Sequence, residues 1–237
     1  MSDHIANSIH YMWENCGQQI SLDNLADVAK YSKYYFVRRF HVETRCSPVR
    51  FLSAVRMARS KYMLATTSTN VSDIAHAVGY LSYGTFTSRF TESVGLSPAQ
   101  YRRHARGEEF PLRWSRSPAI KAPAPGTSLT GRLVEPCGAP VRLAYLSIFS
   151  AANPLSSAAA LVIVANQGSF TLTGLTPGKW VARAITPPAT SDSRPLRDYR
   201  AGSCEFQLDT RAHLDITIPL AERTIRTPPF LLALPDR

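Results

Sequence analysis

Hydrophobic residues recur with two different periods along this chain. Up to residue 107 they are spaced three or four positions apart, so that Ile5, Ile9 and Met12 would share one face of a helix. In the second half they alternate with polar residues, as Leu214 and Ile216 do, which is typical of strands with one buried face. The pattern therefore predicts an all-α domain followed by an all-β domain.

Polar residues that suit helix caps mark where the helices begin. Ser47 with Pro48 and Ser97 with Pro98 each place a capping hydroxyl before a proline at the first helical position. Further caps are expected at Asp3, at Ser21 and at Asn70, which is paired with Asp73. The helix from Pro48 is predicted to be long and to bury Phe51, Leu52, Val55, Ala58, Tyr62 and Ala65.

Prolines place the boundary between the two halves. Pro48 and Pro98 are the only prolines within residues 1–107, and the other 15 of the 17 follow later. Residues 110–126, FPLRWSRSPAIKAPAPG, are rich in Pro, Ser and Arg and have no periodicity, which favours an extended linker. We predict a helical domain at 1–107, a linker at 108–126 and a β domain at 127–237.

The helical half contains an internal repeat. Phe36 and Phe40 match Phe86 and Phe90 at an offset of 50 residues, and both copies continue into Ser-Pro. Upstream the offset is 49, so the second copy has one extra residue in its turn, around 79–81. Each copy predicts a short helix, a tight turn and a second helix with aromatics at i and i+4, the pattern of a helix-turn-helix.

The second helix of each copy has a computable outward face, because its phenylalanines must be buried. At about 100° per residue, that face carries Tyr34, Val37, Arg38 and His41 in the first copy and Gly84, Thr87, Ser88 and Thr91 in the second. A short helix with such a face suits the major groove of DNA, about 12 Å wide. An ordinary solvated face is the alternative, and the duplication together with the basic charge favours DNA.

Residues 4–106 resemble the DNA-binding domain of the AraC/XylS family of bacterial transcription regulators. The family signature is nearly complete in residues 71–103, VSDIAHAVGYLSYGTFTSRFTESVGLSPAQYRR. The first copy matches the looser half in residues 24–52, NLADVAKYSKYYFVRRFHVETRCSPVRFL, with Cys46 where a glycine is usual. The resemblance implies seven helices, two helix-turn-helix units joined by the long helix, and sequence-specific control of transcription.

The resemblance also suggests roles for matching positions. Neither Gly84 nor Ser88 can make the paired hydrogen bonds to guanine that Arg38 can, so we expect the first copy to supply most base readout and the second to fix register through phosphates. The expected base-reading residues are Tyr34, Val37, Arg38, Gly84 and Ser88. The expected contacts to the DNA backbone are Lys33, Arg39, Tyr83, Thr85, Arg89, Arg102 and Arg103.

About seven short strands joined by Gly- and Pro-containing turns predict an antiparallel β-sandwich for the second half. Residues 168–184, GSFTLTGLTPGKWVARA, are similar to the carboxypeptidase-regulatory or transthyretin-like sandwich family. The loop at 187–202 carries three arginines and is either a solvated loop or a docking site for an anion. The apolar tail at 229–236 is expected to form a final strand or a dimer contact.

The β half shows no catalytic constellation, since it lacks paired histidines, closely spaced carboxylates and a nucleophile elbow. We therefore expect no enzyme, and the scattered Cys16, Cys46, Cys137 and Cys204 predict neither metal nor cofactor. The β domain is either a regulatory module that binds a small molecule or an interaction module. The candidate partners are double-stranded DNA, RNA polymerase, a small-molecule effector and a second copy of the chain.

Charge points to a polyanionic partner, because Lys+Arg minus Asp+Glu is 27 − 17 = +10 and the pI is about 9.8. No secretory signal is visible, and the longest apolar run, Ala158–Ala165, is far below the ~20 residues that span a bilayer, so a soluble cytoplasmic protein is expected. The rival to a regulator is a nonspecific architectural DNA binder. A DNA-repair enzyme is disfavoured, because the repair proteins that carry similar reading domains use clustered metal cysteines, which this chain lacks.

Overall fold

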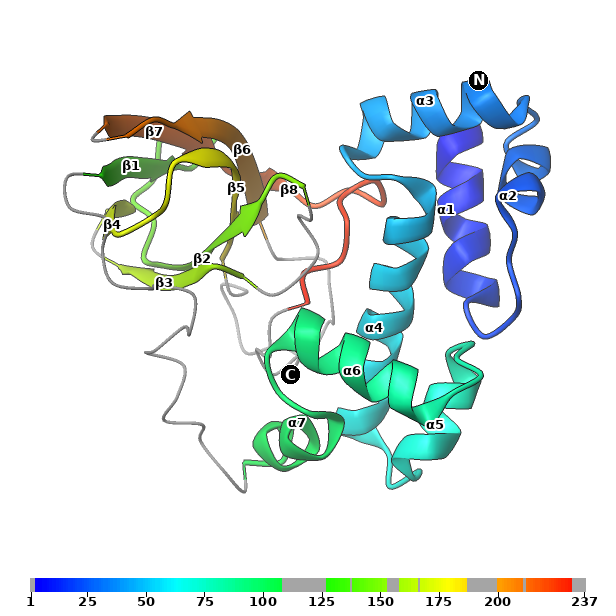
Figure 1. The fold of residues 1–237 in the computed structure, drawn as a ribbon. Coiled ribbons are helices and arrows are strands. Elements are labelled where there is room, and N and C mark those ends of the chain that lie inside the picture. The colour runs from blue at the N-terminus through cyan, green and yellow to red at the C-terminus, as the bar shows by residue number, and fades with distance from the viewer. Residues whose placement is uncertain are drawn as a thin grey trace. The chain divides into compact units, whose positions relative to one another are not determined.

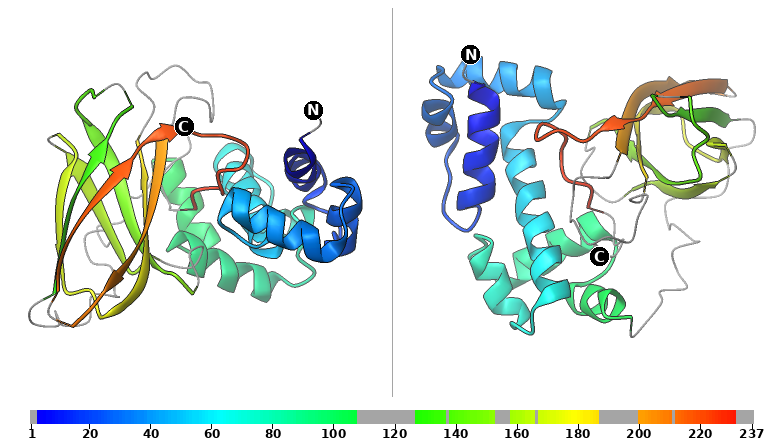
Figure 2. Two further views of the ribbon diagram at one scale, coloured as in Figure 1. Left: turned by 90° about the horizontal axis from the view of Figure 1, so that it is seen from above. Right: turned by 180° about the vertical axis from the view of Figure 1, so that it is seen from behind.

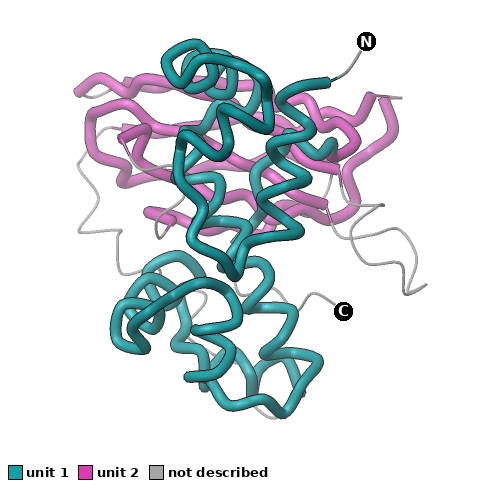
Figure 3. The backbone as a smooth tube through the Cα atoms, turned by 90° about the vertical axis from the view of Figure 1, so that its right-hand side faces the viewer, with its two compact units in different colours: residues 1–110, 224–237 teal, residues 111–223 magenta. Residues whose placement is uncertain are grey.

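The computed structural model describes residues 3–107, 127–136, 138–152, 158–165, 167–186, 200–210 and 212–231. These residues belong to two compact units (Figure 3). The helical unit comprises residues 1–110 together with the C-terminal segment 224–237, and the β unit comprises residues 111–223. The predicted linker at 108–126, Cys137, the loop from 187 to 199 and the tail from 232 lie outside the described residues.

Seven α-helices make up the described part of the helical unit (Figure 1). Side chains of Asp3, Ser21, Ser47, Asn70 and Ser97 cap five of them as predicted, each accepting a hydrogen bond from a backbone amide of the first turn. The helices are α1 (His4–Asn15), α2 (Leu22–Val28), α3 (Lys33–Thr44), α4 (Pro48–Thr66), α5 (Val71–Ala77), α6 (Tyr83–Val94) and α7 (Pro98–Ala105).

Each copy of the repeat has its own aromatic core. Phe36 and Phe40 of α3 are fully buried, and the ring of Phe40 meets Phe51 of α4 edge-on, with 5.4 Å between ring centroids. In the second copy, Phe90 of α6 meets Tyr101 of α7 in the same manner at 5.7 Å. The two copies therefore match in packing as well as in sequence, because the first turns of α4 and α7 contribute equivalent aromatic residues to the two cores.

The extra residue of the second copy is Leu81. Both turns use the same backbone device, because the amides of Tyr31 and Tyr80 donate to the carbonyl oxygens of Ala26 and Ala75 at 3.0 and 2.9 Å, still at an offset of 49. The next equivalent residues are the two N-cap serines, already at an offset of 50. The insertion thus lies within the predicted range, at a side chain that is 85% exposed.

The placement of the usual glycine at Cys46 was wrong. Gly95 ends α6 in the left-handed conformation with φ of 87°, and the equivalent residue after α3 is Arg45, with φ of 55°. Cys46 is instead buried. The first copy therefore holds an arginine in a conformation that glycine adopts at less cost.

Of the six residues predicted to be buried on α4, Ala58 and Ala65 are half-buried and Tyr62 is 48% exposed. The neighbouring Lys61 is buried instead, and its Nζ lies 5.5 Å from the centroid of the Tyr101 ring. Leu64, Ser60 and Met57 are buried as well. Lys61 was not predicted to be buried, because its end is charged, but the long apolar stem of a lysine can pack against apolar surface.

The described strands of the β unit form two sheets. A three-stranded sheet has the order β4-β1-β7, and a five-stranded sheet has the order β3-β2-β5-β6-β8. The strands are β1 (Ser128–Val134), β2 (Leu143–Ser150), β3 (Ala160–Ala165), β4 (Ser169–Thr173), β5 (Gly178–Ile185), β6 (Arg200–Leu208), β7 (His213–Pro219) and β8 (Ala221–Glu222). Buried side chains of both sheets, such as Leu129 and Ile218 from one and Leu146 and Phe206 from the other, form one core.

The expectation of purely antiparallel strands was wrong for one pair. β1 and β7 run parallel, with Ser128 opposite His213 and Val134 opposite Pro219. The other five strand pairs are antiparallel. Alternating burial tells which side chains face inward and carries no information on strand direction, which is why the sequence pattern missed this pairing.

None of the described helices combines the length and the apolar character that crossing a bilayer requires.

Two glycines in the helical unit offer a matched test of its packing. Gly79 and Gly95 both have positive φ, 86° and 87°, but a methyl group on Gly79 would lie 2.7 Å from the Cys16 carbonyl oxygen and against Arg56, whereas Gly95 faces open space. We expect Gly95→Ala to lower the free energy of unfolding by about 1 kcal/mol. Gly79→Ala should cost about 1 to 3 kcal/mol more, from the added overpacking.

Urea denaturation of the two variants and the unsubstituted chain, followed by circular dichroism at the helical wavelength, measures both costs. Equal destabilisation by the two substitutions would contradict the close approach of α1 and the second turn.

Candidate nucleic-acid interface

The two predicted reading helices present the same pattern of exposure. From residue 32 to 45 and from residue 82 to 95, buried, half-buried and exposed positions follow one another identically, at an offset of 50. In both helices the buried positions are the two phenylalanines and a residue in the last turn, Thr44 or Val94. The opposite face of each helix is therefore available to a partner.

On α3 the exposed face carries large and charged side chains. Tyr34 is 89% exposed, and Arg38 and Lys33 are exposed as well. Val37 lies at the margin of this face and is half-buried. Arg39 is exposed too, so four of the five predicted contacts of the first copy are open to solvent and the fifth, Val37, is half-buried.

On α6 the equivalent face is small and nearly uncharged. Gly84, Thr85 and Ser88 are exposed, and Tyr83 is 51% exposed. A methyl group added to Gly84 would meet only the Ser82 hydroxyl, at 3.8 Å, so packing does not require a glycine there. Gly84 leaves the backbone of the first helical turn bare, which permits a surface to approach closely.

Charge also distinguishes the two helices. α3 carries Lys33, Arg38 and Arg39 against Glu43, a balance of 3 − 1 = +2, whereas α6 carries Arg89 against Glu92, a balance of 1 − 1 = 0. Helix α3 is therefore the more attractive of the two to a polyanion.

Two of the cations on α3 already have carboxylate partners within the unit. Lys33 Nζ lies 3.0 Å from Asp23 Oδ2, and Arg39 Nε lies 2.6 Å from Glu43 Oε1. Lys33 and Asp23 are 47% and 65% exposed, and Arg39 and Glu43 are 50% and 17% exposed. An ion pair as exposed as Lys33–Asp23 is weak in water, so a phosphate could compete for Lys33. The half-exposed Arg39 is paired with a more buried carboxylate.

The arginines of α7 are partly committed to the fold. Arg102 donates from Nη2 to the Thr69 carbonyl oxygen, and Arg106 donates to the Thr67 carbonyl oxygen at 3.2 Å. Burial, followed by the charge of Arg106, lowers the pKa of Arg102 from its ordinary value. Arg103 is exposed. These contacts tie the end of α7 to the loop before α5, which opens the second helix-turn-helix.

Leu81 is a surface residue of the second turn that the face analysis did not single out. It immediately precedes Ser82, the N-cap of α6. The change of offset from 49 to 50 was the one sequence signal that pointed to this position. An exposed leucine beside the start of a reading helix adds an apolar group where the first copy has none.

Helix α4 separates the two helix-turn-helix motifs of the helical unit. Its 19 residues extend about 28 Å at 1.5 Å per residue. In Figures 1 and 2, α3 lies near the start of α4, and α5 and α6 lie toward its end. Arg56 of α4 ties this helix to α1, because it donates to the carbonyl oxygens of Cys16 and Gln18 at 2.9 and 2.7 Å.

Comparison with known proteins covers the helical unit. A family model described as a helix-turn-helix domain matches residues 25–104. The lactose operon transcription activator of Staphylococcus xylosus is 27% identical over 104 residues, which are 44% of this chain and 37% of that protein. The transcriptional regulator Rob of Salmonella typhimurium is 34% identical over 96 residues, 40% of this chain and 33% of Rob.

The chain spans only about a third of the length of these two relatives. Among solved structures, the DNA-binding domain of the global transcriptional factor AdpA, in complex with a target DNA, is 29% identical. It covers 46% of this chain and 97% of the AdpA domain, with a TM-score of 0.44.

The seven helices, the duplicated cores and the matched segment agree with one another. The relatives named above are transcription regulators. Residues 25–104 accordingly form a helix-turn-helix DNA-binding domain of the AraC type, with homologues among the AraC/XylS-family regulators.

Proposed function

We propose that this chain is a sequence-specific transcription regulator that places α3 and α6 in two adjacent major grooves of one DNA duplex. The observation that carries this proposal is the identical exposure pattern of the two helices, which leaves equivalent faces open at both ends of α4. The helical span of about 28 Å approaches the ~34 Å of one duplex turn. Two helices held at that spacing can enter neighbouring grooves on one side of the duplex.

The two helices divide the work unequally in this proposal. Arg38 reads a guanine with paired hydrogen bonds, and Tyr34 and Val37 contact neighbouring bases. Gly84 and Ser88 bring α6 close to the base edges while adding little discrimination. Phosphates are held by an outer set of side chains, namely Lys33, Arg39, Tyr83, Thr85, Arg89, Arg102 and Arg103.

The β unit is proposed to be a sandwich of the carboxypeptidase-regulatory or transthyretin-like kind that controls the regulator. The single core shared by its two sheets supports a sandwich. As a control module it would bind a small molecule or a second copy of the chain, and either would act by favouring one state of the DNA-binding unit. RNA polymerase is the proposed partner at the promoter.

Selection from a randomised duplex library with the full chain tests sequence specificity. We expect one sequence family to be enriched, and the chain to prefer it over a scrambled duplex by about 10³-fold or more at physiological salt. The preference should persist as salt is raised, while both affinities fall. An equal affinity for selected and scrambled duplexes across the salt series would instead identify a nonspecific architectural protein.

Substitution of two arginines tests the division of labour. Arg38→Ala should remove about 1 to 3 kcal/mol of discrimination at one base pair. Arg89→Ala should weaken selected and scrambled duplexes alike and reduce the salt slope by about one. Arg142 is an exposed arginine ahead of β2, and Arg142→Ala serves as the control for the loss of one positive charge.

Fluorescence anisotropy with single-base variants of the selected duplex provides both measurements. Equal losses of base selectivity in Arg38→Ala and Arg89→Ala would refute the proposed difference between the two helices.

A further inference from the structure

The C-terminal segment that follows β8 belongs to the helical unit. Residues 224–231 group with the helices. A turn begins this segment, because the Thr227 amide donates to the Thr224 carbonyl oxygen at 3.0 Å and the Thr224 amide donates to the Thr227 hydroxyl at 3.2 Å. Arg226 lies within the turn, and Pro229 and Leu231 beyond it are buried. The segment is thus held by polar and by apolar contacts.

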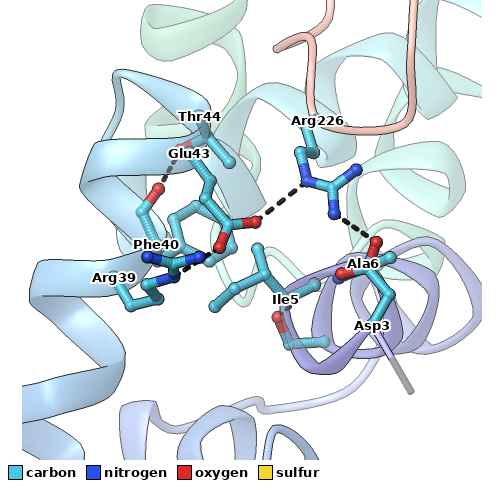
Figure 4. A network of polar contacts seen from close by, with 9 residues as sticks. Asp3, Ile5, Ala6, Arg39, Phe40, Glu43, Thr44 and Arg226 are labelled. Carbon is cyan, nitrogen blue, oxygen red and sulfur yellow. Dashed lines mark hydrogen bonds and ion pairs between the residues drawn. The ribbon is translucent and has the colours of Figure 1, made fainter. Parts of the chain in front are cut away.

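The Arg226 side chain bridges two helices that lie far from it in sequence (Figure 4). Its Nε donates to Glu43 Oε2, in the last turn of α3, at 2.9 Å, and its Nη2 pairs with Asp3 Oδ2 at the start of α1. These partners are 183 and 223 residues away. Hydrogen bonding to Glu43, followed by hydrogen bonding to Asp3, raises the pKa of the Arg226 guanidinium, so it stays charged.

Both carboxylate oxygens of Glu43 have a cationic partner in this arrangement. Its Oε2 accepts from Arg226 and its Oε1 lies 2.6 Å from Arg39 Nε, while the Glu43 side chain is only 17% exposed. Asp3 is similarly engaged, since its Oδ1 accepts the Ala6 amide as the cap of α1. We call Asp3, Glu43, Arg39 and Arg226 the clasp.

We propose that Asp3 and Glu43 form a docking site for the C-terminal segment of this chain, and that docking of Arg226 there strengthens DNA binding by the first helix-turn-helix. This inference rests on the proposed function and extends it to regulation. Arg226 acts as a positioning residue, since it bridges α1 and α3 and is not itself on the outward face of α3.

Charge gives the direction of the effect. With Arg226 docked, the clasp has a balance of 2 − 2 = 0, whereas without Arg226 it has 1 − 2 = −1. An unbalanced Glu43 would repel phosphate and hold Arg39 more tightly, although Arg39 is a proposed phosphate contact. Docking therefore releases Arg39 for DNA as well as fixing the end of α3 against α1.

The clasp could transmit a change in the β unit to α3, because the segment that carries Arg226 directly follows β8 in the chain. Arg226 follows Glu222, the last residue of β8, by four positions. A ligand that changes the β unit near β8 could pull the segment from its site or hold it there. The clasp would then convert that event into a change of DNA affinity through differential stability of the docked state.

Substitution at Arg226 in the full chain tests the clasp. The probe is the duplex that the unsubstituted chain selects from the randomised library. We expect Arg226→Ala to weaken binding about three- to tenfold, as loss of a partly exposed ion-pair network would. Arg226→Lys should recover part of the loss, because it restores charge without the two-pronged bridge. Arg142→Ala should show no comparable loss.

A double-mutant cycle and amide exchange separate the clasp from a general charge effect. In the Glu43→Gln background, Arg226→Ala should add little further loss, because its main partner is already neutral. Hydrogen exchange measured by mass spectrometry should become faster in α3 of Arg226→Ala and stay unchanged in α6.

The outcomes distinguish the clasp from the proposed function. If the unsubstituted chain selects no duplex, the regulator proposal fails, and faster exchange of α3 in Arg226→Ala would still support docking. If selection succeeds while Arg226→Ala binds equally well and exchanges equally slowly, the clasp is overturned. Tighter binding by Arg226→Ala would also overturn it, because the segment would then be inhibitory.

Discussion

Burial of two phenylalanines one helical turn apart determines which face each reading helix presents. Phe36 and Phe40 on α3, and Phe86 and Phe90 on α6, have no exposed surface, so rotation of either helix would bring large aromatic rings into water. The helices that receive these rings begin with the same Ser-Pro cap. The same pair of buried phenylalanines explains why α3 and α6 have the same exposure pattern although their outward residues differ. Packing does not constrain the outward residues.

Local rules predicted most of the helical unit. Caps, periodicity and the repeat located the helices and even the position of the inserted residue, because each depends on contacts within a few residues. Two predictions were wrong. Lys61 is buried where Tyr62 was expected, because its long apolar stem can pack inside. The position of the usual glycine is Arg45, one residue before Cys46, where it was placed. The parallel pairing of β1 with β7 and the contact of Arg226 with Glu43 depend on residues far apart in sequence, where periodicity says nothing.

The two halves of the reading surface differ in the chemistry they offer. Helix α3 combines Arg38 and Tyr34 with a net positive charge, and its last turn is tied to a segment that follows the β unit in the chain. Helix α6 offers backbone, hydroxyls and the exposed Leu81 without net charge. In the proposed arrangement, the helix that discriminates between bases is also the one that the C-terminal segment contacts, while α6 serves as an anchor on the phosphates.

Methylation interference on the selected duplex tests most directly whether both helices enter the major groove, because guanine N7 is exposed there. If both helices enter the groove, two clusters of interfering guanines will lie on one side of the duplex, about ten base pairs apart from centre to centre. A single cluster, or two clusters on opposite sides, would contradict it.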